Sequence, residues 1–181
     1  MQETSLVTYH SAFNKETQHE IVCGLPVLPL KGGSGPAPKT ADSDIVDEAI
    51  TLFRATILFK NFKPEGPADK LVVYLTCFIQ KCLWDIMQLK SSDEANSRTI
   101  CTTLAKKGGP ASTDNANFMR KLGLLSQPAK AMDEKKYCDY LMQLRLECAE
   151  RLVTTIYAHE AMDLKFWLGF GRRPFLGQKF E

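Results

Sequence analysis

The residues with catalytic or metal-binding side chains in this 181-residue sequence include three histidines, six cysteines and, among the carboxylates, the adjacent pairs Asp47–Glu48 and Asp133–Glu134. Zinc sites need several histidine or cysteine ligands, commonly at short-loop or helical spacing. The histidines, His10, His19 and His159, lie far apart, and none has a second histidine or cysteine at such a spacing. The sequence therefore does not predict a metal site.

The cysteines are compatible with disulfides, with a nucleophile or with packing in the core. No two are spaced C-x-x-C, and most lie among apolar residues of expected helices. The first residues lack the pattern of a signal peptide, and no apolar run is long enough to span a bilayer. We expect free, mostly buried thiols in a reducing cytoplasm, with a disulfide framework as the alternative. The cysteines are Cys23, Cys77, Cys82, Cys101, Cys138 and Cys148.

Asp47–Glu48 and Asp133–Glu134 are pairs of carboxylates, the groups that acid–base catalysis uses. Both pairs fall in the first turn of an expected helix, where negative charge is stabilising. The stretch GGSGPAPK at 32–39 has the glycines of a phosphate loop but neither its spacing nor a preceding strand. We predict that the chain is not an enzyme and holds no metal or cofactor. An enzyme site assembled from distant residues is the open alternative.

The stretch KFWLGFGRRPFLGQKF, residues 165–180, interleaves aromatic and basic side chains. Chain ends are usually loose and polar, because they have no core in which to bury aromatic rings. Some of these rings are expected to pack on the body of the protein. Arginine and aromatic residues concentrate at protein–protein hot spots, so Arg172 and Arg173, flanked by Phe170 and Phe175, predict docking on a partner with an acidic, grooved surface.

Two other partners of a basic, aromatic tail are an anionic membrane and single-stranded nucleic acid. The net charge is only +2, whereas nucleic-acid binders are usually clearly basic with clustered lysine and arginine. Neither nucleic-acid binding nor direct membrane binding is expected. The alternatives kept beside a docking protein are a cytosolic helical adaptor and a peripheral membrane or nucleic-acid binder that uses the tail.

The elements that position the tail follow from helical spacing of apolar residues. We predict an all-α fold, a single irregular bundle of about five helices with a long extended N-terminal segment and a short C-terminal helix. The whole chain, 1–181, is expected to form one helical domain. Its parts are an extended segment over 1–41, a helical core over 42–160 and a basic, aromatic segment over 161–181.

Glycine and proline between Gly24 and Thr40 predict an extended, turning segment, in which VLPL at 27–30 presses apolar side chains onto the body. Arg145 and Glu147 are expected on the flanks of the apolar stripe of the long helix. Residues 108–130 are the least readable part of the sequence. The helices are predicted from about Asp42 to before Pro64, from Pro67 through Lys90, from a capping box at Ser91 and Glu94 to about Lys106, from Asp133 to Tyr157, and from a cap at Asp163 over 165–170.

Several short pieces match one family, in family order, over nearly the whole chain. They are Tyr9-His10-Ser11, Leu28-Pro29-Leu30, Gly35-Pro36-Ala37, Asp44 to Ala49, Phe53-Arg54-Ala55, LFKNF at 58–62, Ala68-Asp69-Lys70, Gln143-Leu144-Arg145 and Lys165 to Leu176. With these pieces the sequence resembles subunit 3 of the actin-related protein 2/3 complex, the small helical subunit of the actin-branching assembly. The family's P-G-x-P-G-F-P-L-N stretch is not recognisable between Lys106 and Leu125, and the last residues also differ.

The resemblance implies a non-catalytic structural subunit in the cytoplasm, at sites of branched actin such as cortical patches or leading edges. Its partners would be actin-related protein 3 and the other subunits of a seven-subunit complex, with actin filaments contacted through the assembled complex. ATP would be bound by the actin-related partners. We predict partner contacts at Trp167, Arg172, Arg173 and Phe175, with Tyr9 and His10 as weaker candidates.

Overall fold

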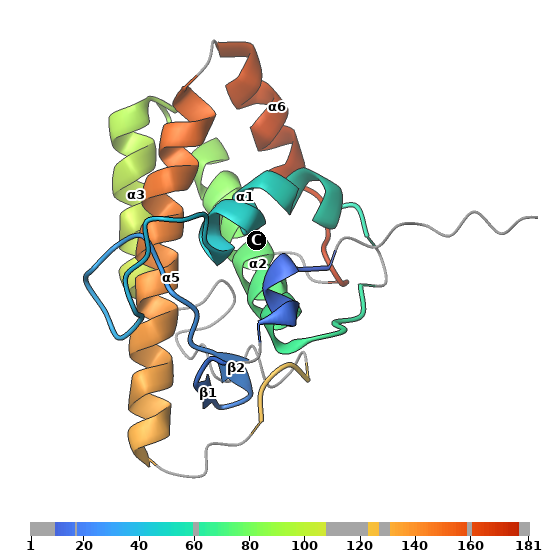
Figure 1. Ribbon diagram of the computed structural model, residues 1–181. Helices are drawn as coiled ribbons and strands as arrows, with labels where there is room; N and C mark the ends of the chain where they lie inside the picture. The colour runs from blue at the N-terminus through green and yellow to red at the C-terminus, as the bar shows by residue number, and fades with distance from the viewer. Residues whose placement is uncertain are drawn as a thin grey trace, which may run out of the picture.

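Five α-helices carry most of the described chain in this computed structural model (Figure 1). The structure describes residues 10–16, 18–59, 62–107, 123–126, 131–158 and 161–177. Among these residues the only strands are two of two residues each, so the predicted all-α class is confirmed. The helices are α1 (Ile45–Thr56), α2 (Pro67–Met87), α3 (Glu94–Lys107), α5 (Ala131–Tyr157) and α6 (Ala161–Gly171).

Helix α2 is the central element, in contact with each of the other four helices. It is apolar around most of its circumference, and most of its residues are buried, as expected of a helix surrounded by others. Pro67 occupies the first turn, where the missing N–H costs nothing. Gly66 offers no side-chain cap, and Asn14 of the N-terminal segment replaces it: Asn14 Oδ1 accepts from the backbone N of Ala68 and Asp69 at 3.0 and 3.3 Å.

Helix α1 begins where predicted and ends early. Asp44 is the N-cap, and its carboxylate accepts from the backbone N of Val46 and Asp47. The sequence predicted helix until just before Pro64, but α1 ends at Thr56. The backbone N of Leu58 and of Phe59 then bond three residues back, at 3.1 Å each. The last turn therefore tightens, although apolar residues continue beyond it.

Two predicted helix starts are wrong. Helix α3 is capped by Asp93, whose Oδ1 accepts from Asn96 N at 2.8 Å, and Ser91 merely donates to the Asp93 carboxylate. Aspartate is as good an N-cap as serine, so the Ser91–Glu94 capping box does not form. Helix α6 begins at Ala161, which places Asp163 inside the helix and not at its cap.

The N-terminal segment lies against α2 and α5 through a short 3₁₀ helix (Ala12–Lys15) and an antiparallel hairpin of β1 (Ile21–Val22) and β2 (Leu25–Pro26). The hairpin was not predicted, because a strand of two residues is too short to show the alternation of apolar and polar residues that marks a strand. As predicted, Val27, Leu28 and Leu30 are buried. The Leu28 backbone N donates to Tyr140 Oη of α5 at 3.0 Å.

Candidate interaction surface

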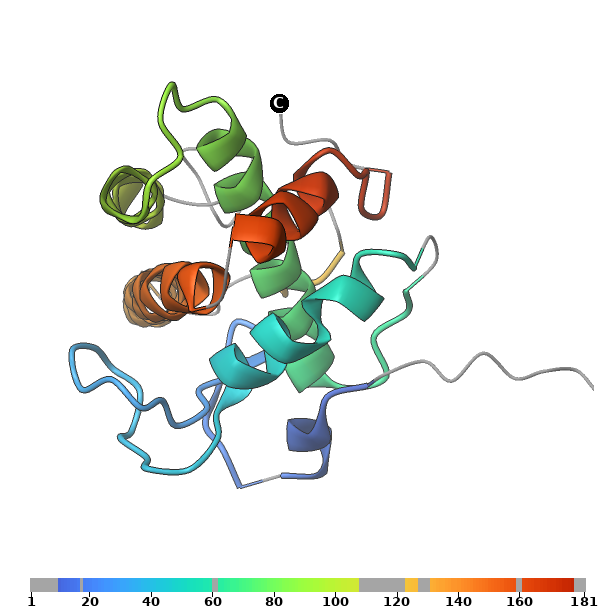
Figure 2. The same ribbon diagram turned by 90° about the horizontal axis from the view of Figure 1, so that it is seen from above.

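Helix α6 lies over α2 beside α1 (Figure 2). The Trp167 ring stacks on Phe53 of α1, with centroids 5.8 Å apart, and only 7% of Trp167 is exposed. Phe170 meets the same Phe53 ring edge-on at 6.1 Å. Trp167 was predicted to touch a partner, but in this chain it is mostly a core residue.

The chain after α6 folds back onto α2. Gly171 permits the approach, because a Cβ there would lie 3.0 Å from the backbone N of Trp84. The Gln80 side chain of α2 donates to the Arg173 carbonyl. Phe175 is fully buried. This second predicted contact residue is therefore also part of the core, and of the four residues predicted in the tail only the two arginines are exposed.

The exposed face of α6 and its following turn forms a cation–aromatic patch. Half of Phe166 is exposed, and its ring meets Phe170 edge-on at 5.2 Å. The Arg173 guanidinium lies 5.7 Å from the Phe170 centroid, and Arg172 and Arg173 are both exposed. We call Phe166, Phe170, Arg172 and Arg173 the C-terminal surface.

Arg54 of α1 extends this patch and was missed by the sequence reasoning. Its guanidinium lies 5.5 Å from the Phe166 centroid and 5.8 Å from that of Trp167. Within the described ranges no carboxylate pairs with Arg54, Arg172 or Arg173. The position of Arg54 beside Phe53 in the sequence carried no signal that it would face α6. Sequence spacing alone does not bring two separate helices together.

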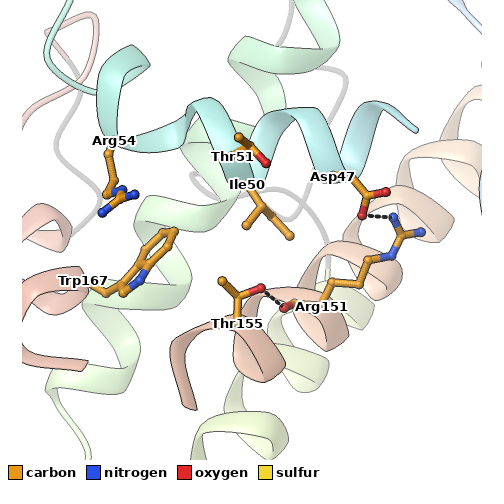
Figure 3. A pocket seen from close by; sticks show the side chains of 7 residues that line it. All are labelled: Asp47, Ile50, Thr51, Arg54, Arg151, Thr155 and Trp167. Carbon is orange, nitrogen blue, oxygen red and sulfur yellow. Dashed lines mark hydrogen bonds and ion pairs between the residues drawn. The ribbon is translucent and has the colours of Figure 1, made fainter. Parts of the chain in front are cut away.

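A groove of about 440 Å³ opens beside Arg54, between α1, α5 and α6 (Figure 3). Arg54 and Trp167 stand at one end, and Asp47 and Arg151 at the other. Ile50, Thr51 and Thr155 line the middle.

The Arg151 end of the groove is a closed ion network. Arg151 bonds Asp44 at 2.6 and 2.8 Å, Asp47 at 3.0 Å, and Glu147. Burial alone would raise the pKa of the Asp44 carboxyl, but the bonds from Arg151 and from backbone N–H groups lower it overall. This network ties α1 to α5, and each of its charged groups already has a partner within the chain.

His10 is committed to the chain's own fold. Its Nδ1 lies 2.7 Å from Asp69 Oδ2 and its Nε2 lies 3.1 Å from Glu65 Oε1. Ser11 N donates to Asp69 Oδ1 at 2.7 Å. Burial favours the neutral acid, yet these hydrogen bonds lower the pKa of Asp69 below its usual value. Tyr9, the other weaker candidate, lies outside the described residues.

The groups considered for catalysis have structural roles. Asp47 and Glu48 lie in the first turn of α1 and Asp133 and Glu134 in that of α5, as predicted. Asp47 pairs with Lys31 and Arg151, while Glu48 accepts from Ser11 and Ala12. Each of these two carboxylates is therefore occupied by partners inside the chain.

Four cysteines, Cys77, Cys82, Cys101 and Cys148, are buried free thiols. Burial raises the pKa of the Cys77, Cys82 and Cys148 thiols, which keeps them protonated and unreactive. Over the described ranges, no group of three or more His, Cys, Asp or Glu residues is arranged to hold a metal ion. No helix within those ranges has the length and apolar character needed to cross a membrane.

The glycine-rich stretch at 32–39 uses its own backbone donors. Gly32 N donates to Glu147 Oε2 at 3.0 Å and Ala37 N to Gln143 Oε1 at 3.1 Å, both on α5. A phosphate loop needs such N–H groups free to cradle an anion. The N–H groups of Gly32 and Ala37 already donate to the Glu147 carboxylate and the Gln143 amide. The loop therefore anchors the N-terminal segment on α5.

Comparison with known proteins identifies the family of this chain. A family model described as "P21-Arc: ARP2/3 complex ARPC3 (21 kDa) subunit" matches residues 6–180. The chain belongs to this family. Relatives named actin-related protein 2/3 complex subunit 3 include one from Arabidopsis thaliana, 36% identical over 94% of this chain and 97% of the relative. Another, from Dictyostelium discoideum, is 36% identical over 95% and 99%, and one from Saccharomyces cerevisiae is 33% identical over 94% and 97%.

In this member of the P21-Arc family the Gln143-Leu144-Arg145 piece is internal. Arg145 was predicted on the flank of α5, but only 2% of it is exposed. Its Nε donates to the Ala105 carbonyl at 2.8 Å and its Nη1 to Tyr74 Oη at 2.6 Å. Burial raises the pKa of Tyr74 to about 12, against the opposing effect of Arg145. Arg145 is buried because α3 and α2 pack over that flank of α5. The spacing of apolar residues along α5 does not reveal this packing.

Proposed function

We propose that this chain is a non-catalytic structural subunit of the actin-related protein 2/3 complex that docks on actin-related protein 3. Membership of the P21-Arc family carries this proposal, since relatives covering nearly the whole chain bear that subunit's name. The subunit acts within a seven-subunit complex, in the cytoplasm and at the actin cytoskeleton. It contacts actin filaments through the assembled complex, and ATP belongs to the actin-related partners.

The C-terminal surface is the proposed docking element. Trp167 and Phe175 hold it in place from the core side, and Arg172, Arg173 and Phe166 face outward. Arginines that pair with no described carboxylate, beside exposed rings, are the composition of a protein–protein hot spot. Docking that is tighter to the nucleating arrangement than to the resting one shifts the equilibrium by that difference. In this way a structural subunit supports the nucleation of branched filaments.

The test is recovery of the complex with a tagged full-length chain from its own cells. The native chain is expected to recover two actin-related proteins with the other small subunits. Changing both Arg172→Glu and Arg173→Glu should lower that recovery about tenfold or more, which corresponds to roughly 1.4 kcal/mol, with the helical circular dichroism unchanged. Lys106→Glu with Lys107→Glu is the control, because these are also adjacent exposed cations at the end of a helix.

Undiminished recovery of the double arginine variant would rule out docking through this surface. Recovery of lipid or nucleic acid alone, lost steeply as salt rises, would instead favour the peripheral binder. A helical adaptor outside actin assembly would bring down other proteins and neither actin-related one.

A further inference from the structure

The groove between α1, α5 and α6 has an apolar floor and a polar rim. Ile50 and Trp167, each only 7% exposed, form the floor. Thr51 is exposed on the α1 rim, with Arg54 one helical turn further along the same helix. A volume of about 440 Å³ admits one or two side chains of a bound segment.

The two ends of the groove differ in charge. At the Asp47 end the carboxylate already pairs with Lys31 at 2.5 Å and with Arg151 at 3.0 Å. At the other end Arg54 lies over the rings of Phe166 and Trp167, and no described carboxylate pairs with it. A guanidinium held against aromatic faces keeps its edge N–H groups available for a bidentate carboxylate. Arg173, exposed after α6 and 5.7 Å from the centroid of Phe170, which itself packs on Phe166, adds to the positive charge at this end.

The charges at the two ends of the groove favour a peptide over a nucleic acid as its ligand. A nucleic acid would continue past Arg54 with further phosphates, but the cations at the far end, Lys31 and Arg151, already pair with Asp47. A peptide needs only one acid at the Arg54 end and an apolar side chain over Ile50 and Trp167. We propose that the groove binds a segment of a partner protein that presents an aspartate or glutamate beside an apolar residue. This inference rests on the proposed function, because the groove adjoins the C-terminal surface through the Arg54–Phe166 contact.

The test places a photo-reactive benzoylphenylalanine at position 51 of the full-length tagged chain in its own cells, and at position 99 as the control. Thr99 is an exposed threonine on α3, which does not line the groove. Cross-links from position 51 are expected to map to one segment that carries Asp or Glu next to an apolar residue. Arg54→Glu should lower recovery of that partner about tenfold, and exchanging the partner's acid for arginine should restore it.

Position 51 cross-linking no more than position 99 in a complex that assembles would overturn the groove proposal. Cross-linking to a segment without acidic residues would overturn it as well. If Arg54→Glu loses helical circular dichroism, Arg54→Gln gives the recovery measurement in its place, and undiminished recovery of that variant would count against the proposal. If an acidic segment is cross-linked but no actin-related protein is recovered, the groove proposal holds and the proposed function fails.

Discussion

Trp167 and Phe166 are neighbours in sequence with opposite surroundings. Trp167 is buried against Phe53, whereas 52% of Phe166 is exposed. Removing a buried aromatic side chain loses its burial free energy and leaves a cavity, at about 3–5 kcal/mol. Trp167→Ala should therefore lower the free energy of unfolding by about that amount, and Phe166→Ala by less than about 1 kcal/mol. Urea titration of the two purified variants, followed by circular dichroism, measures both.

The opposite order would mean that the core holds the Phe166 ring and not the Trp167 ring. The sequence showed that the rings of the tail need a surface to pack on, but not which ring points inward. The choice between them depends on Phe53, more than a hundred residues earlier. No local pattern encodes that contact, which is why Trp167 and Phe175 were predicted as partner residues.

At the level of elements, the two glycines in the last turn of α6 have different surroundings. A Cβ on Gly171 would lie 3.0 Å from Trp84 N and 3.1 Å from the Leu83 carbonyl carbon, whereas nothing lies within 4 Å of one on Gly169. Alanine is favoured over glycine in a helix by roughly 1 kcal/mol. Gly169→Ala should therefore leave the protein as stable as before or more so. Gly171→Ala should destabilise it, because the backbone of α2 must move.

Thermal unfolding of these two variants distinguishes a helix fixed by close backbone approach from one that slides. Equal melting temperatures would show that α6 can shift on α2 without cost.

The existence of the helices could be predicted from the sequence, but some of their ends could not. The five helices were readable because apolar residues repeat along them, and Asp44 and Pro67 marked two starts. The end of α1 was missed because apolar residues continue beyond Thr56. The cap at Asp93 was missed because serine and aspartate are equally good N-cap residues, and Ser91 was chosen.

At the level of the whole molecule, two buried carboxylates fasten the N-terminal half. Asp44 binds Lys31 N and Arg151, and Asp69 binds His10 and Ser11 N. The fold lowers both pKa values from 3.8. A lowered pKa in the folded state gives stability that is complete above the unfolded pKa and is lost as pH falls through the folded one. We expect the urea midpoint to hold from pH 7 to about 5 and to drop below about pH 4.

Asp69→Asn should be less stable at pH 7 and lose less stability on acidification, because the titrating group is gone. Asp42→Asn, at an exposed aspartate before α1, is the control and should keep the native profile. An Asp69→Asn profile parallel to that of the native chain would show that Asp69 does not contribute to the acid sensitivity.

The anchors of the N-terminal segment have a consequence for synthesis on the ribosome. Leu28, Ala37 and Asp44 bond partners on α5 that follow them by 112, 106 and 107 residues. At about 5–20 residues per second, translation needs roughly 5 to 20 seconds to deliver those partners. Leu28, Ala37 and Asp44 thus leave the ribosome well before the partners that fix them. Throughout that interval the core that buries Leu28 and Leu30 is incomplete, and a chaperone would find them more exposed than in the folded chain.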